Sequence, residues 1–205
     1  MSDSKRASLA LALAALTATC LCAFAADLPS DRPVIISAKH PIWLLEQPDT
    51  DNPLLTASTP GTSAYGDHQV HATLQISCHP QTRGASLTLQ IDPRALGFDY
   101  HAFEGKDASA HGPLKLTMGD RAFSDQWVAG MWAAGGALQV GSIFAIATGI
   151  PRDELAYWAD DASPGQTLTL SLASAAANSP SLTAVFTLPQ NNLGLRQVIQ
   201  PCLDR

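Results

Sequence analysis

Residues 69–78 read Gln69-Val70-His71-Ala72-Thr73-Leu74-Gln75-Ile76-Ser77-Cys78 and carry the strongest strand pattern in the chain. Apolar and polar residues alternate along this run, as they do in a β-strand that buries one face. The apolar face holds Val70, Ala72, Leu74, Ile76 and Cys78, and the polar face holds His71, Thr73, Gln75 and Ser77. The alternation therefore predicts a strand whose buried face ends on a cysteine.

The next run, residues 85–92, repeats this alternation and places Leu87, Leu89 and Ile91 on one face. Only residues 79–84, with one proline and one glycine, separate the two runs. Two alternating runs joined by a short loop of this kind indicate an antiparallel hairpin. Pro93 ends its second strand, because proline cannot donate to a sheet.

Similar patterns occur along the rest of the chain. They predict strands at 114–118 and at 126–133, the latter bent at Gly130, and a second hairpin from 167–173 and 182–188. The runs 34–36 and 42–45 are two short strands or a strand and an entry loop. The sequence allows two structures near Gly141-Ser142: a hairpin formed by residues 138–140 and 143–147, or a buried helix over 137–147.

Two helices and two loops complete the expected secondary structure. Pro151 and the acids after it predict a helix over 152–158, and Asn191 or Asn192 starts another through Val198 that Pro201 ends. Residues 47–66 are rich in proline, glycine and small polar residues and predict a long surface loop, and 93–113 is irregular. The fold class is mainly β, an antiparallel β-sandwich or open barrel of about seven or eight strands with one or two short helices.

The first 25 residues have the three parts of a secretory signal peptide. Lys5 and Arg6 give a basic start, an apolar run follows, and Ala23-Phe24-Ala25 supplies the small residues of a cleavage site. We therefore expect cleavage near Ala25 and a single exported β domain over 26–205, located in the periplasm or secreted.

Two alternatives to a cleaved signal peptide stay open. The apolar run is long enough to remain as a membrane anchor. Cys20 allows lipoprotein anchoring, although the residues before it, Thr17-Ala18-Thr19, fit a lipoprotein signal poorly. No second apolar run is long and pure enough to span a bilayer, so no membrane span is expected in the mature chain.

Removal of the signal peptide leaves two cysteines, Cys78 and Cys202. An exported protein with two distant cysteines most simply pairs them, and we expect a disulfide that fixes the chain end to the 69–78 strand. The alternative is a pair of buried free thiols.

The mature chain is acidic and has no basic cluster. Loss of Asp3, Lys5 and Arg6 leaves 10 basic and 17 acidic residues, so the net charge changes from −6 to −7. Such a surface argues against nucleic acid and anionic membranes as partners.

The sequence holds no recognisable catalytic, metal or cofactor constellation. No Gly-x-Ser-x-Gly elbow, phosphate-binding loop or dinucleotide fingerprint occurs, and neighbouring acids such as Asp153 and Glu154 sit in polar contexts. His71 and His79 share one strand face but lie roughly 27 Å apart at ~3.4 Å per residue, too far for one metal ion. We expect no catalytic residues, no metal and no cofactor.

Acidic loops and tryptophans are the candidates for contact with a partner. We expect Trp127 in the core, whereas Trp132 and Trp158 lie in contexts that allow exposure, and an exposed tryptophan beside an acidic loop is a typical anchor for a protein. The candidate partner-binding residues are Asp49, Asp51, Trp158, Asp160 and Asp161.

The order of these features resembles that of small disulfide-bonded β proteins of the Gram-negative periplasm. The features are a signal peptide, Trp43 near the mature start, Cys78 closing a strand, and a final segment from Phe186 to Leu195 before Cys202. That group includes inhibitors and immunity proteins that neutralise toxins or lysozymes. The resemblance implies a non-catalytic exported protein that holds a protein partner through its loops. The alternatives are a cell-envelope hydrolase with Asp/Glu or His residues assembled by the fold, and an accessory or assembly protein of an envelope machine.

Overall fold

The hairpin predicted from residues 69–92 lies near the middle of the sheet. In the computed structural model, which describes residues 41–47, 54–105, 108, 111–125 and 127–204, strands β3 (His68–His79) and β4 (Gly84–Ile91) pair antiparallel, with Ile76 opposite Leu87. The described residues all belong to one compact unit, Asp31–Arg205. The signal peptide, the cleavage site and the run 34–36 lie outside the described residues.

Around this hairpin the other elements follow in chain order. The strands are β1 (Leu44–Glu46), β2 (Leu55–Tyr65), β5 (Leu114–Met118), β6 (Arg121–Asp125), β7 (Ala129–Ala134), β8 (Ser142–Gly149), β9 (Thr167–Leu172) and β10 (Leu182–Thr187). The helices are α1 (Pro93–Leu96), the 3-10 turn η1 (His101–Phe103), α2 (Arg152–Ala159) and α3 (Leu193–Leu203).

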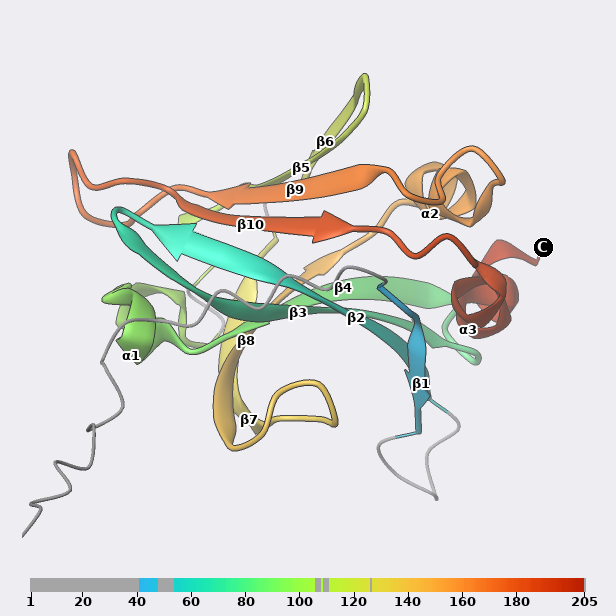
Figure 1. Ribbon diagram of the computed structural model, residues 1–205, viewed down its shortest axis with the longest axis horizontal. Coiled ribbons are helices and arrows are strands. Elements are labelled where there is room, and N and C mark those ends of the chain that lie inside the picture. The colour runs from blue at the N-terminus through green and yellow to red at the C-terminus, as the bar shows by residue number, and fades with distance from the viewer. Residues whose placement is uncertain (1–40, 48–53, 106–107, 109–110, 126, 205) are drawn as a thin grey trace, which may run out of the picture. The chain divides into compact units, whose positions relative to one another are not determined.

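The strands form one curled antiparallel sheet. Its order in the described part of the chain is β6-β5-β9-β10-β2-β3-β4-β8-β7, and β1 pairs with β2 outside that path. Figure 1 shows the sheet curving round on itself, with α2 and α3 at one end and α1 at the other. The mainly β class is confirmed, and the curled single sheet, a half-barrel, matches the open-barrel form of the prediction.

The core fills the inner face of the curl. The alternation of β3 places Leu74 and Ile76 there with no exposed surface, as the sequence predicts. Burial of one such side chain stabilises the fold by about 1.5–3 kcal/mol. The same face carries Cys78, whose Sγ lies 1.96 Å from that of Cys202, so the predicted cysteine pair is confirmed at disulfide distance.

Helix α3 packs on the end of β3 beside this cysteine pair. Its buried residues, Leu195, Val198, Ile199 and Cys202, have the spacing of one helix face. The helix includes Pro201, so the prediction that Pro201 ends it is wrong. The proline lies in the last turn, where buried residues and the cysteine pair hold the backbone in place.

The predicted loop 47–66 is also wrong over most of its described length, because Leu55–Tyr65 is strand β2. Pro60 lies opposite Thr73 of β3, and on the other side of β2 it falls between the residues that pair with β1 and those that pair with β10, so no described strand pairs with that side at this position. Gly61 allows β10 to approach closely, since a Cβ there would lie 2.2 Å from the Phe186 ring. Both residues resemble turn signals in sequence but serve strand packing here.

The segment between β7 and β8 differs from the prediction as well. Strand β7 confirms the expected strand only over residues 129–133, because Trp127 and Val128 precede it and residue 126 lies outside the described residues. Its hairpin partner is β8, and residues 138–140 belong to the connecting loop. Neither the hairpin about Gly141-Ser142 nor the alternative helix over 137–147 forms. The apolar run Ile143–Ala147 is a strand because it pairs on both sides, with β4 and with β7.

Three short elements complete the comparison. The predicted irregular region begins with α1, which Asp92 caps by accepting hydrogen bonds from Arg94 N and Ala95 N, and which Gly97 ends with φ +67°. Strand β6 was not predicted from the sequence. Strand β1 begins at Leu44, two residues after the start of the run 42–45 that was predicted as a strand or an entry loop. Helix α2 and the β9–β10 hairpin are as predicted.

Within the part of the chain that the structure describes, no helix combines the length and apolar character needed to cross a bilayer.

Candidate functional site: a polar groove and an open strand edge

The outer face of the sheet carries the polar side of the β3–β4 hairpin. Gln75 lies opposite Thr88, and Thr73 lies opposite Gln90. Since directly opposed residues in an antiparallel pair point to the same side, these side chains share the outer face. The same rows continue onto β8 as alanines, with Thr88 opposite Ala147.

A groove of about 680 Å³ lies on this face, and we call it the outer-face groove. Gln75, Thr88 and Gln90 line its polar side, and four alanines with Met131 line the other. The small alanine side chains leave space above the sheet, because a methyl group fills little of it. Its lining residues are Glu46, Gln47, Gln75, Thr88, Gln90, Met131, Ala133, Ala134, Gly135, Gly136, Ala145 and Ala147.

The β7–β8 loop, residues 135–141, forms one wall of the groove and is held at three points. Glu46 Oε1 accepts a hydrogen bond from Ala137 N at 3.1 Å, and His71 Nε2 lies 3.1 Å from Leu138 O. Thr73 Oγ1 donates to Gln139 Oε1 at 3.5 Å. The loop is therefore tied to β1 and β3 across the sheet face.

Strand β7 is one end of the sheet (Figure 1), and beyond Gly130 no described strand pairs with its outer edge. In an antiparallel strand, alternate residues direct N–H and C=O to opposite sides. Gly130 O accepts from Gly105 N at 2.9 Å, which shows that even-numbered residues of β7 face away from β8. The N–H and C=O of Trp132 and Ala134 therefore face the open side, and they form no hydrogen bond with any described residue.

Apolar side chains surround this edge. Met131 is 57% exposed, Trp132 37% and Trp127 53%, so the expectation that Trp127 belongs to the core is wrong. Trp127 precedes β7 rather than lying within it, and its backbone N–H donates to Asp125 Oδ1 at 3.0 Å. Met131 and Trp132 are neighbours in the strand and therefore give each face of β7 an exposed apolar side chain.

Contacts on several sides fix the indole of Trp132. Its Nε1 donates to Glu104 Oε1 at 3.0 Å, and the Arg94 guanidinium lies 5.2 Å from its ring centroid. The rings of Tyr100 and Phe144 pack against it edge-on, at 5.0 and 5.5 Å. A ring held in this way loses little conformational freedom when it meets a partner.

The opposite end of the sheet, β6, differs from β7 in its charge. Arg121 begins β6 and donates two hydrogen bonds to Glu154 of α2. These hydrogen bonds and the carboxylate charge raise the pKa of the guanidinium above its ordinary value. Asp125 ends the strand, and charges at both ends of an edge strand oppose pairing with another chain. Strand β7 contains no charged residue.

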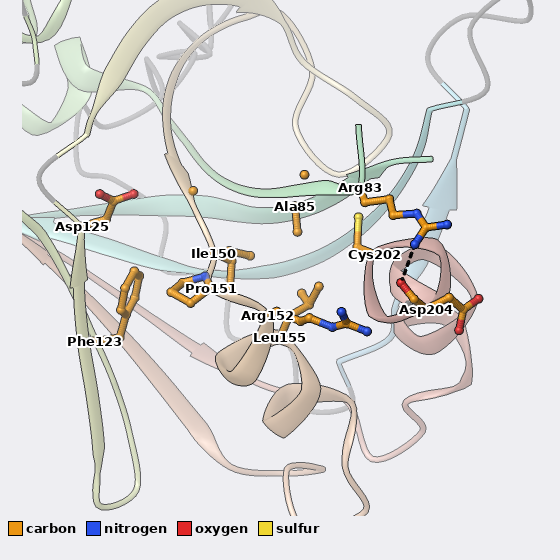
Figure 2. A pocket seen from close by; sticks show the side chains of 12 residues that line it. Arg83, Ala85, Phe123, Asp125, Ile150, Pro151, Arg152, Leu155, Cys202 and Asp204 are labelled. Carbon is orange, nitrogen blue, oxygen red and sulfur yellow. Dashed lines mark hydrogen bonds between the residues drawn. The ribbon is translucent and has the colours of Figure 1, made fainter. Parts of the chain in front are cut away.

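Two further hollows lie elsewhere in the described structure. Figure 2 shows the first, about 450 Å³, between β4, β6, α2 and α3. Arg83 and Arg152 stand at its rim, and Arg83 Nη1 donates to Asp204 O at 3.1 Å. The second, also about 450 Å³, lies between residues 41–43 and 187–194. The arginines of the first are exposed, and both hollows lack a buried polar side chain that is directed at a ligand.

The partner-binding residues predicted from sequence do not gather into one surface. Asp49 and Asp51 lie outside the described residues. Trp158 is 2% exposed, so its ring belongs to the core and only Asp160 and Asp161 beside it can be reached. Asp161 is paired with Arg196 of α3.

The described residues contain no group of three or more His, Cys, Asp or Glu side chains placed to hold a metal ion. The residues of the groove and the β7 edge were not singled out from sequence as a site. Gln75, Thr88 and Gln90 were visible only as the polar side of two alternating strands, and Trp132 only as an unassigned tryptophan.

Comparisons with models of protein families, with curated proteins and with solved structures found no match.

Proposed function

We propose that this chain is a non-catalytic, exported binding domain that holds a protein partner by adding an extended segment of that partner to β7. One observation carries the proposal: the backbone of Trp132 and Ala134 faces an open sheet edge whose strand has no charged residue. Natural edge strands are normally protected from pairing by charges, proline or a covering segment. An unprotected edge is the surface used when a peptide is added to a sheet.

The surroundings of the edge suit such a partner. The added segment receives main-chain hydrogen bonds from Trp132 and Ala134, while Met131 and Trp132 offer apolar contact on opposite faces of the strand. Segment 104–105 already covers the Gly130 end of the edge, so the partner pairs with the other half. An ordered aromatic ring next to free backbone groups is a typical anchor of a protein interface.

The export part of the proposal rests on two features. The N-terminal sequence has the form of a signal peptide. The cysteine pair at disulfide distance is compatible with an oxidising compartment. The negative net charge further suits a partner segment with basic residues.

Selection of random linear peptides displayed on phage against the purified protein tests the proposal. Enriched peptides are then titrated, as synthetic peptides, against the wild type and three variants. Ala134→Pro removes an outward N–H, Met131→Lys places a charge at the edge, and Val140→Lys makes the same kind of change on the β7–β8 loop, where Val140 is 93% exposed.

We expect the first two variants to weaken peptide binding about tenfold or more, since a lost hydrogen bond of about 1.4 kcal/mol corresponds to a factor of ten. Val140→Lys should bind as the wild type does. Failure to enrich any peptide, or peptides that bind Ala134→Pro and Met131→Lys unchanged, contradicts strand addition at β7.

A further inference from the structure

The outer-face groove is lined by a nearly buried glutamine whose amide bonds no described residue. Gln90 is 7% exposed and lines the groove, and its side chain forms no hydrogen bond with any described residue. The side chains of Gln75 and Thr88 in the same lining also have no such bond. Polar groups in sites this enclosed usually have a hydrogen-bond partner, so the Gln90 amide, with the half-buried Gln75 and Thr88 beside it, is available to a molecule that enters the groove.

The unpaired groups define the chemistry of that molecule. A glutamine carboxamide offers two N–H donors and one C=O acceptor, and a threonine hydroxyl offers one donor and accepts as well. A second amide complements a carboxamide with one donor and one acceptor side by side. Gln75 and Gln90 lie in neighbouring rows of the hairpin, opposite Thr88 and Thr73, so both amides can bond one ligand.

The charge and polarity of the lining narrow the ligand class. Glu46 is the only charged residue among the lining residues, one of its oxygens already accepts from Ala137 N, and no Lys, Arg or His is present. This lining disfavours an anion. It contains no aromatic ring on which a sugar could stack, and Met131 with the alanines offers aliphatic contact instead. The volume of about 680 Å³ is typical of a small-molecule site.

We propose that the outer-face groove binds a small neutral molecule that carries a carboxamide or peptide unit, with the amide on Gln75, Thr88 and Gln90 and the aliphatic part on Met131 and the alanines. Met131 and Ala134 belong both to this lining and to β7, so the groove adjoins the proposed strand-addition edge. The two proposals are distinguished by Gln90→Leu, which should weaken binding of a small amide in the groove and leave binding of a peptide at β7 unchanged.

Nuclear magnetic resonance of the full mature domain tests the site with a defined probe, N-acetyl-alanine amide. Its titration should shift the side-chain NH₂ signals of Gln75 and Gln90 in a saturable way, whereas acetate and glucose at equal concentration should not. Gln90→Leu removes the buried amide, and Ala147→Leu fills the groove while it keeps both amides. Gln69→Leu is the matched control, because Gln69 is an exposed glutamine of the neighbouring strand β3 and lies outside the lining.

Both groove variants should bind the probe about tenfold more weakly or not at all, and Gln69→Leu should bind it as the wild type does. Absence of saturable shifts, equal shifts with glucose or acetate, or unchanged binding to Ala147→Leu would overturn the proposal. The wild-type titration with the three probes decides the question even if a variant fails to fold.

Discussion

Removal of the cysteine pair should lower the stability of the domain by an amount that the structure allows us to calculate. Cys78 and Cys202 are 124 residues apart in sequence, and their bond closes a loop of that length in the unfolded chain. The chain-entropy relation gives about 5 kcal/mol for such a loop. The double variant Cys78→Ala/Cys202→Ala should lose about 4–5 kcal/mol of unfolding free energy.

The fold itself should survive this change. Leu195, Val198 and Ile199 remain buried when the cysteines are replaced, and together contribute about 5–9 kcal/mol through burial. Urea unfolding monitored by circular dichroism should therefore show a native spectrum with a lower midpoint. Wild-type protein treated with a reductant is the matched control and should unfold at the midpoint of the double variant. A loss below about 1 kcal/mol, or reduced wild type as stable as oxidised, would refute the assignment.

Three single substitutions test other parts of the account by urea unfolding. Ile76→Asp buries an unpaired charge and should lower the free energy of unfolding by about 3 kcal/mol or more. Gln75→Asp, on the groove side of the same strand, should lower it by less than ~1 kcal/mol. Equal losses for the two variants would show that the two faces of β3 are wrongly assigned. Gly61→Ala drives a methyl group into β10 and should cost about 1–3 kcal/mol, so a neutral result would contradict the close approach. Asn192→Ala leaves the buried Trp43 indole N–H without its acceptor and removes one of the two hydrogen bonds that the Trp158 carbonyl accepts, the other coming from Ser163 Oγ. It should cost about 1–3 kcal/mol, and a change within ~0.5 would show that these bonds do not form.

The fold could be predicted from the sequence where a single pattern of apolar and polar residues runs through a whole strand or helix. The β3–β4 and β9–β10 hairpins have a strict alternation, and the helix at 152–159 begins with proline followed by acids. Strand β2 has no such signal, because Thr and Ser fill positions where apolar residues would mark the buried face. Its Pro60 and Gly61 indicate a turn only as long as the positions of β1 and β10 are unknown.

Much less of the candidate site could be predicted. The polar face of β3 was visible, but it becomes a groove only because the β7–β8 loop and Glu46 close over it. Similarly, the edge position of β7 follows from the strand order, which connects residues far apart in sequence. Acidic loops and a tryptophan suggested partner contacts at 158–161, yet Trp158 lies in the core because the Asn192 amide and packing hold the end of α2 inward.

Amide hydrogen exchange along β7, measured with and without a peptide enriched on the wild-type protein, tests the proposed strand addition most directly. In β7, the N–H groups of Trp132 and Ala134 face away from β8 and bond no described residue, whereas segment 104–105 covers Gly130. Binding should slow exchange at Trp132 and Ala134 by about tenfold or more, which corresponds to about 1.4 kcal/mol, with smaller changes at Met131 and Ala133. Unchanged exchange at Trp132 and Ala134, with protection gained elsewhere in the domain, would contradict the account.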